Sequence, residues 1–441
     1  MDAKHITPYT FIRLAQLHPA PIFPALRLLR FSDSESRNIR KVKHIAAGCF
    51  LLVSPAIKTL IIDRFGPDPT EHNSFFEAFF VSLTQGSTNI HDLTVDGRIS
   101  HWKILASSCN LRNLCFYKKF GQNWTTYLSV DIKSLRSFNN LTSIKINVDI
   151  EDRYNSEDIQ NLLQYVPELN SSECLNCLPH LNHMTLIGDV ALFVLVLQHI
   201  PSNNLKSILI LSRERFDMIL TPLWALFFEQ LSHCQYLEHI LILGTKATLR
   251  TPTASDFACI ISQKHLQSLL KLKHLWSLQI SGYIIADLHE AFIVQLALLW
   301  NQLSDLYLPD SQLVPTVGST AQSLGALSHI ALHHPNLKVL KLSVNATDLA
   351  ITIPSNYHSR SRLRELFLST RDDVRDLAAP QRLLLARYIY RVFPSLKVVS
   401  GVEKEFWEEI NAMVQAFKAV RQEALSETLM DHHNSITTTS T

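Results

Sequence analysis

Residues 333–344 read HHPNLKVLKLSV, and this stretch contains the pattern that decides the fold. It places Leu337, Leu340 and Leu342 in the spacing Leu-x-x-Leu-x-Leu, shortly after Pro335. Side chains alternate between the two faces of a strand, so Leu340 and Leu342 point to the same side. Proline ends a helix because it lacks the amide donor. The stretch therefore predicts a helix end, a turn and then a strand with one buried face.

The same spacing recurs along almost the whole chain, with leucine, isoleucine, valine, methionine or phenylalanine at the three apolar positions. Successive copies begin roughly 31 residues apart, compared with about 20–29 residues in a leucine-rich repeat, so helices and loop insertions must fill the excess. Parallel strands are joined by a long return segment, usually a helix. The triplets are Leu26/Leu29/Phe31, Ile57/Leu60/Ile62, Ile90/Leu93/Val95, Leu111/Leu114/Phe116, Leu141/Ile144/Ile146, Leu181/Met184/Leu186, Leu205/Ile208/Ile210, Leu237/Ile240/Ile242, Leu275/Leu278/Ile280, Leu303/Leu306/Leu308, Leu337/Leu340/Leu342 and Leu363/Leu366/Leu368, followed by a degraded copy at Leu396/Val399.

These repeats predict an α/β fold, namely a leucine-rich repeat solenoid. We expect a right-handed horseshoe of the ribonuclease-inhibitor type, with a parallel sheet on the concave face and helices on the convex face. Residues 1–22 should form an N-terminal capping helix, and residues 23–402 one solenoid of about 12–13 irregular repeats. Residues 403–424 should form a C-terminal capping helix, and residues 425–441 a disordered tail. The apolar stripe of the C-terminal helix consists of Phe406, Trp407, Ile410, Met413, Val414 and Phe417.

An alternative role for the helix at residues 403–424 is docking into a groove of a partner protein. A solenoid must cover the core of its last repeat, however, and the stripe is wide enough to do so. We therefore expect the helix to be structural.

Composition excludes several classes of function. The 441 residues include only 11 glycines, which argues against the glycine-rich phosphate loops of nucleotide-binding enzymes. The formal net charge is +2, so no global field favours nucleic acid or membrane. The first residues lack an apolar signal segment, and the seven cysteines are scattered, as in a reducing compartment. We expect a non-enzymatic protein of the cytoplasm or nucleus, without cofactor or membrane association.

Two local clusters invite a chemical interpretation. Cys174, Cys177, His180 and His183 are of the types that bind zinc, but only two residues separate the pairs, which is not the spacing of a known zinc finger. The repeat register divides them between a helix end, a loop and an outward strand position, so we expect no metal. Separately, three arginines flank a strand where they could reach a phosphate or an acidic peptide, although acidic residues lie close by in the sequence: Arg360, Arg362 and Arg364.

The residues between the buried positions of each strand point to the concave side. In the early repeats they are mixed polar groups, which are ordinary for a protein-binding surface. In the middle, Ser207–Leu211 and His239–Leu243 place aliphatic side chains outward beside Ile187. These form either a contact patch or a surface covered by the insertion Thr245–Ala258. The predicted partner-binding residues are Thr59, Asp63, Asp92, Asp96, Asn113, Tyr117, Lys145, Asn147, His183, Leu209, Leu211, Leu241 and Leu243.

The array resembles the leucine-rich repeat region of F-box proteins from basidiomycete fungi. The segments that carry the resemblance are loose patterns of leucine, proline and tryptophan spread over nearly the whole chain. They are Pro8–Phe11, Phe23–Arg27, Leu270–Ile280, Ala297–Leu308, His333–Val344, Arg391–Lys397 and the helix containing Trp407. In such proteins an F-box docks onto a Skp-type adaptor of a cullin ubiquitin ligase, and the repeats present the substrate.

The resemblance thus implies a protein partner, a substrate for ubiquitination, held by the repeats. Residues 1–20 leave no room for an F-box ahead of the first repeat, so we expect this chain by itself not to bind a Skp-type adaptor tightly. An alternative function is a leucine-rich repeat regulator of a signalling protein, such as a GTPase, without any link to ubiquitin. The sequence leaves the partner itself open, because residues on the concave face vary freely on a fixed frame.

Overall fold

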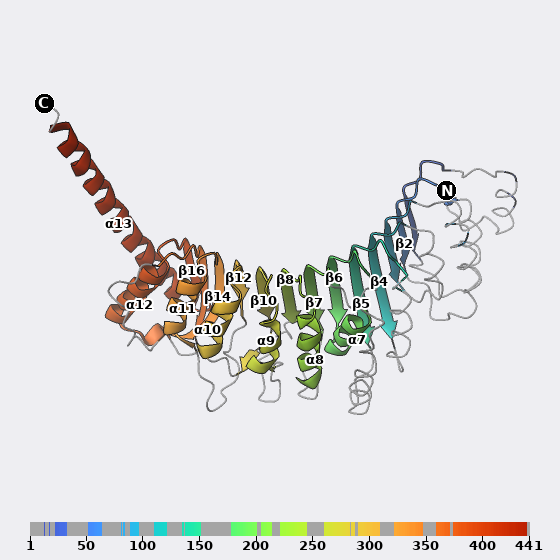
Figure 1. Cartoon of the computed structure of the whole chain (residues 1–441), viewed down its shortest axis with the longest axis horizontal. Coiled ribbons are helices and arrows are strands. Elements are labelled where there is room, and N and C mark those ends of the chain that lie inside the picture. The colour runs from blue at the N-terminus through green and yellow to red at the C-terminus, as the bar shows by residue number, and fades with distance from the viewer. Residues whose placement is uncertain are drawn as a thin grey trace. The chain divides into compact units, whose positions relative to one another are not determined.

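A computed structural model shows how the chain folds (Figure 1). The fold consists of two compact units. Unit 1 comprises Met1–Glu214 and Pro222–Leu237, and unit 2 comprises Arg215–Thr221 and Glu238–Thr441. The structure describes residues 23–32, 52–63, 89–96, 110–120, 137–150, 178–200, 204–213, 221–244, 260–282, 284–286, 290–308, 322–346, 359–370 and 374–438, together with Arg13, Leu17, Val81, Leu83 and Leu135.

Unit 1 contains a parallel sheet whose strands are neighbours in space in the order of the chain. Each strand coincides with a predicted triplet, because the alternating leucines and isoleucines bury one face. The strands are β1 (Leu28–Ser32), β2 (Thr59–Asp63), β3 (Asp92–Asp96), β4 (Asn113–Phe120), β5 (Ser143–Ile150), β6 (His183–Gly188) and β7 (Ser207–Ser212). The described helices of this unit are α7 (Val190–His199) and α8 (Thr221–Ser232).

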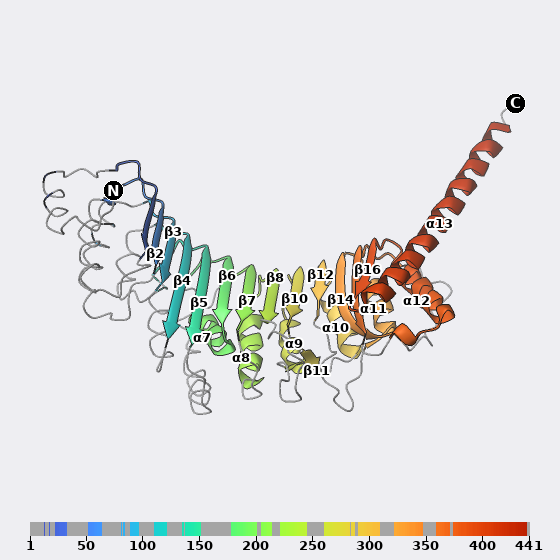
Figure 2. The same ribbon diagram turned by 180° about the vertical axis from the view of Figure 1, so that it is seen from behind.

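Unit 2 repeats this architecture, and Figures 1 and 2 both show its helices α9, α10 and α11 along one side of the strands. The parallel strands are β8 (His239–Gly244), β10 (Ser277–Ser281), β12 (Asp305–Tyr307), β14 (Val339–Asn345), β15 (Glu365–Thr370) and β16 (Val398–Gly401), with β13 (Gln322–Ser323) paired to β14. The shorter strands β9 (Ile260–Ser262) and β11 (Ile284–Ala286) pair with each other. The helices are α9 (Gln263–Leu269), α10 (Glu290–Leu299), α11 (Gly325–His333), the 3-10 turn η5 (Val374–Asp376), α12 (Ala379–Val392) and α13 (Lys404–Thr438).

Parallel strands and returning helices make each unit an α/β structure, as the sequence predicts. The expectation of one continuous solenoid over residues 23–402 concerns how the two units join, and it stays a prediction. The N-terminal capping helix expected at residues 1–22 lies almost entirely outside the described residues.

The proline connectors are tight turns rather than simple helix ends. At five triplets among the described residues, the amide of the leucine or isoleucine that opens the triplet donates to the carbonyl three residues earlier, with proline at the second position of the turn. Proline suits that position because its ring already holds the φ angle the turn requires. The five turns are Phe23–Leu26, Ser54–Ile57, Leu178–Leu181, His334–Leu337 and Phe393–Leu396.

Helices α7 and α8 give unit 1 a thick aromatic core. All ten residues of α7 are buried, and its first turn is capped by Asp189, whose carboxylate accepts a hydrogen bond of 3.2 Å from the Leu192 amide. Phe193 of α7 meets Trp224 and Phe227 of α8 at ring-centroid distances of 6.4 and 5.9 Å. Such ring pairs stabilise a core beyond the area they bury.

Helix α13 packs onto the end of unit 2. Its residues Phe406, Trp407, Ile410 and Val414 are buried, and it contacts both α12 and β16. Helix α13 extends to Thr438, beyond the predicted end of the capping helix at residue 424 and into the segment expected to be a tail. The segment Leu425–Thr441 is rich in serine and threonine but contains neither glycine nor proline, so it lacks the residues that most strongly interrupt a helix.

Candidate protein-interaction surface

The outward-pointing residues of the strands form two surfaces, one per unit, which we call outer face 1 and outer face 2. On outer face 1 the parallel register stacks like positions into rows running across the strands. One row contains Thr59, Asp92, Asn113, Ser143, His183 and Ser207, and the next contains Ile61, Thr94, Cys115, Lys145, Thr185 and Leu209. A third row contains Asp96, Tyr117, Asn147, Ile187 and Leu211.

The first row is held together by its own hydrogen bonds. The Asp92 carboxylate accepts from the Thr59 hydroxyl at 3.2 Å and from the Asn113 side-chain amide at 2.6 Å. The structure therefore brings three sequence-predicted residues into one polar group. Asp63 belongs to β2, but its side chain lies outside the described residues.

A second group lies beside it on β4 and β5. The Lys145 ammonium is 5.6 Å from the centroid of the Tyr117 ring. Burial raises the pKa of the Cys115 thiol, and the hydrogen bond to Cys115, together with burial, raises the pKa of the Tyr117 hydroxyl. A thiol with a raised pKa stays protonated at neutral pH, so this group lacks the activated thiolate of a catalytic cysteine.

The predicted aliphatic residues point outward, as the register requires. Leu209 and Leu211 are half-buried on β7 of unit 1, and Leu241 and Leu243 are half-buried on β8 of unit 2. Ile187 also occupies an outward position but is only 8% exposed, with Asn147 and Leu211 as its register neighbours. The insertion Thr245–Ala258, proposed as a cover, lies outside the described residues. Each pair is thus an apolar element of the outer face of its own unit.

Outer face 2 carries aromatic rings paired with lysines, which our interpretation of the sequence missed. Trp276 precedes β10 and is 43% exposed, with the Lys338 ammonium 5.4 Å from its ring centroid. The His239 ring meets Trp276 edge to face at 5.3 Å. On the neighbouring strands β14 and β15, the Lys341 ammonium lies 4.5 Å from the centroid of Phe367. Aromatic residues are among the types enriched at protein interfaces.

Charge is also gathered on outer face 2. Burial raises the pKa of Asp305, while the Ser304 hydrogen bond and the positive charge of Lys338 partly oppose that shift. Burial and the negative charges of Asp305 and Glu365 raise the pKa of Tyr307.

Most of the outward residues of this face can be identified from the sequence. Alternation of side chains along the later strands selects Gln279, Tyr307, Lys341 and Phe367 as outward positions.

The suggested zinc ligands are not assembled in the part of the chain that is described. His180 and His183 are both exposed, at the turn before β6 and at its first residue. Cys174 and Cys177 lie outside the described residues. Among the described residues no group of three or more histidine, cysteine, aspartate or glutamate side chains is placed to hold a metal ion.

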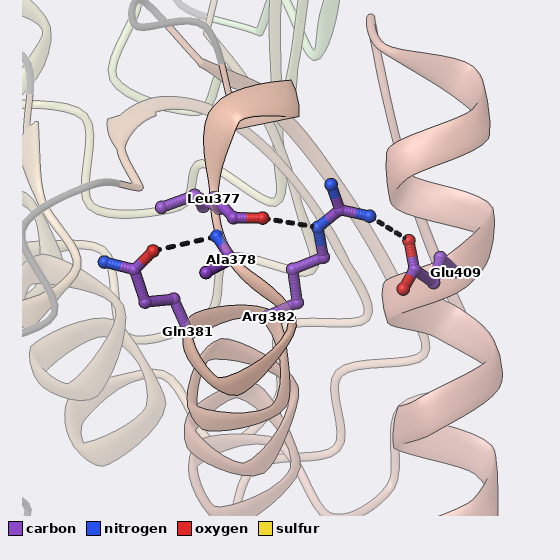
Figure 3. Close-up of polar contacts among 5 residues, drawn as sticks. All are labelled: Leu377, Ala378, Gln381, Arg382 and Glu409. Atoms are coloured by element: carbon purple, nitrogen blue, oxygen red, sulfur yellow. Dashed lines mark hydrogen bonds and ion pairs between the residues drawn. The ribbon is translucent and has the colours of Figure 1, made fainter.

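A hollow of about 710 Å³ lies where α12 and α13 begin. Arg382 bridges its two walls, donating to the Leu377 carbonyl at 2.8 Å and to the Glu409 carboxylate of α13 (Figure 3). The Gln381 side chain in turn accepts from the Ala378 amide at 2.9 Å and caps α12. The contact between Arg382 and Glu409 holds α12 against α13, so we interpret the hollow as part of the packing between these helices rather than as a binding site.

None of the helices in the described residues has the length and apolar character needed to cross a membrane. No protein-family model matches this chain, and a search of curated proteins finds no relative.

Proposed function

We propose that this protein is a leucine-rich repeat module that binds another protein through the outer faces of its strands. The regular parallel strands, built on a Leu-x-x-Leu-x-Leu core and several of them preceded by a tight turn, support this repeat class. One observation carries the binding function: Trp276 remains 43% exposed on outer face 2 while Lys338 and His239 pack against its ring. An exposed indole held in place by its neighbours loses little entropy on binding.

The proposed role is recognition without catalysis. On the outer faces the pKa values of the Cys115 thiol and of the Tyr117 and Tyr307 hydroxyls are raised, chiefly by burial or a hydrogen bond, so these three groups stay protonated at neutral pH rather than exchanging protons. By its resemblance to the repeat region of fungal F-box proteins, the module would present a substrate to a ubiquitin ligase. Copurification of a cullin–adaptor complex with the protein tests that link separately from binding itself.

The test of binding compares two faces of unit 2. The full chain is used as bait in native extract, alongside the double variant Trp276→Ala/Phe367→Ala on outer face 2. A matched double variant, Leu298→Ala/Leu332→Ala, removes exposed apolar side chains from helices α10 and α11 instead. The retained protein is then purified and its Kd measured for all three baits.

We expect the outer-face variant to bind at least about tenfold more weakly, and the helix variant to bind like the original chain. Loss of binding in the helix variant alone would place the interface on the other side of the molecule and overturn the proposal. Retention of no partner by any bait would equally remove its basis.

A further inference from the structure

Three cations form a ladder along the edge of unit 2 where its last strands begin. The Lys338 carbonyl accepts from the Arg364 amide at 2.8 Å and from the Glu365 amide at 3.0 Å. The Arg364 carbonyl accepts from the amides of Lys397 and Val398 at 2.7 and 3.0 Å. Lys338, Arg364 and Lys397 therefore occupy the same repeat position on consecutive strands, about 4.8 Å apart in backbone spacing. We call these three residues the basic ladder.

The charges of the basic ladder face solvent. All three side chains are exposed, and within the described residues none of them takes part in an ion pair. Like charges at this spacing repel one another, so a ligand that neutralises them gains electrostatic free energy. The ladder also adjoins the exposed indole, because Lys338 lies over Trp276.

The neighbouring row indicates what kind of anion fits. Asp305 and Glu365 lie one residue beyond the ladder positions, on β12 and β15. A uniform polyanion such as a nucleic acid strand would approach these carboxylates together with the cations. A polypeptide with a few discrete acidic side chains avoids that repulsion and also supplies an apolar side chain for Trp276.

We propose that the basic ladder and Trp276 bind an acidic segment of a protein partner. This inference rests on the proposed function and specifies the chemistry of the bound segment: carboxylates over Lys338, Arg364 and Lys397, and an apolar side chain against the indole.

The corresponding repeat position in unit 1 also carries basic side chains, so it can be compared with the basic ladder. It carries Arg27, Lys58, His91 and Arg112 on consecutive strands, joined by the same backbone hydrogen bonds. Their charges are similar, but no cation–π contact joins any of these four side chains to an aromatic ring within the described residues. The indole therefore distinguishes the proposed site from an ordinary row of surface cations.

The experiment measures binding of a fluorescent synthetic peptide of glutamate, serine and leucine to the full chain by anisotropy. A peptide with glutamine in place of glutamate is its neutral counterpart, and a short oligothymidylate tests the nucleic acid alternative. The ladder variant is Lys338→Gln/Arg364→Gln/Lys397→Gln. Two controls make the same charge change elsewhere: Arg27→Gln/Lys58→Gln/Arg112→Gln in unit 1, and Lys271→Gln/Arg387→Gln/Arg391→Gln outside the ladder in unit 2. Circular dichroism verifies that each variant is folded.

We expect the glutamate peptide to bind and the glutamine peptide not to bind. The ladder variant should bind about tenfold more weakly, since each exposed ion pair contributes a modest amount. Trp276→Ala should weaken binding as well, the two controls should match the original chain, and added salt should weaken the interaction.

Equal binding of the two peptides, an equal loss in either control, or preference for oligothymidylate would each overturn the inference. Failure of this inference can be distinguished from failure of the proposed function. If a partner is lost with Trp276→Ala/Phe367→Ala but held normally by the ladder variant, outer face 2 is still the interface and only the acidic class of ligand is wrong.

Discussion

Outer face 1 and outer face 2 are built on the same backbone pattern but differ in chemistry. On outer face 1, the polar side chains of Thr59, Asp92 and Asn113 satisfy one another with hydrogen bonds. On outer face 2, Trp276 and Phe367 are overlaid by lysines and remain available to solvent. The buried positions of both units are nearly all leucine, isoleucine, valine or aromatic residues. The repeat thus constrains its inward positions strongly and its outward positions hardly at all, because only the former pack.

The largest expected effect on the comparison comes from removing α13. Without this helix unit 2 should no longer fold stably, so outer face 2 would be lost. Truncation after Gly401 exposes the surface that Phe406, Trp407, Ile410 and Val414 cover. Each such side chain contributes roughly 1.5–3 kcal/mol, and a typical domain has a margin of only about 5–15 kcal/mol. We expect an aggregating or strongly destabilised product in thermal unfolding and light scattering.

Truncation after Leu425 is the matched control and should leave the melting temperature unchanged, because the residues from 421 to 428 are exposed. A soluble product of the Gly401 truncation with the original melting temperature would contradict the capping role and favour a helix that docks into a partner.

Two tryptophans sharpen the contrast between buried and outward positions. Trp224 is fully buried in the aromatic core of unit 1, so Trp224→Ala should lower the free energy of unfolding by about 3–5 kcal/mol. Trp276→Ala, at the exposed position of outer face 2, should change it by less than about 0.5 kcal/mol while weakening partner binding. Urea unfolding measures both. Similar losses for the two variants would mean that Trp276 is part of the core rather than of a binding surface.

A buried histidine should make unit 2 sensitive to acid. Burial lowers the pKa of His334 to about 4, and the positive charge of His333 acts in the same direction. The unfolded chain, with a pKa near 6.5, then binds more protons between about pH 6.5 and 4. Stability is complete above that window and falls as the pH drops through it, by about 3 kcal/mol in total.

The measurement is urea unfolding of the original chain and of His334→Leu at several pH values from 7 to 4. The variant should lose less stability than the original chain across this window. His274→Leu, at an exposed position, serves as the control and should follow the original chain. Parallel pH profiles for all three proteins would show that His334 has no part in the acid sensitivity.

The smallest expected effect tests whether the polar row of outer face 1 stabilises the fold. Asn113→Ala removes the hydrogen bond to Asp92 and should lower the free energy of unfolding by about 0.5–1.5 kcal/mol. Asn147→Ala is the control, since within the described residues its side chain makes no hydrogen bond, and no change is expected. If Asn113→Ala is equally silent and partner binding falls instead, outer face 1 is also an interface.

Much of the fold was predictable from the chain because the deciding signals are local. The triplets located each described strand of the main sheets to within a few residues, apart from the two-residue β13, and the proline connectors marked turns in the correct places. The candidate surface was predicted less well. The outward positions Tyr307 and Phe367 follow from the same alternation as those of the early repeats, whereas Trp276 precedes its strand, so its exposure could not be derived from alternation.

Other features depended on contacts that no periodicity encodes. Ile187 occupies an outward position and is nevertheless buried, which depends on the side chains around it rather than on its own strand. Gly401 leaves space for a close approach: a side chain there would meet the Leu368 carbonyl and the Trp407 ring, each at 2.2 Å. The burial of Ile187 and the lack of space for a side chain at Gly401 both depend on which strands and helices pack next to these residues, and the sequence pattern does not show that.

By itself, the sequence determined the parallel strands, their buried leucines and the turns between them, because alternation and turn chemistry act over a few neighbouring residues. Only the tertiary structure decided how the last strand is closed. There the Asn411 side chain accepts from the Val399 amide at 2.9 Å, and the Gln415 side chain donates to the Lys397 carbonyl at 3.0 Å. Those bonds exist because α13 crosses β16 at one particular position, and the direction of a helix relative to a strand is set by packing rather than by any local pattern.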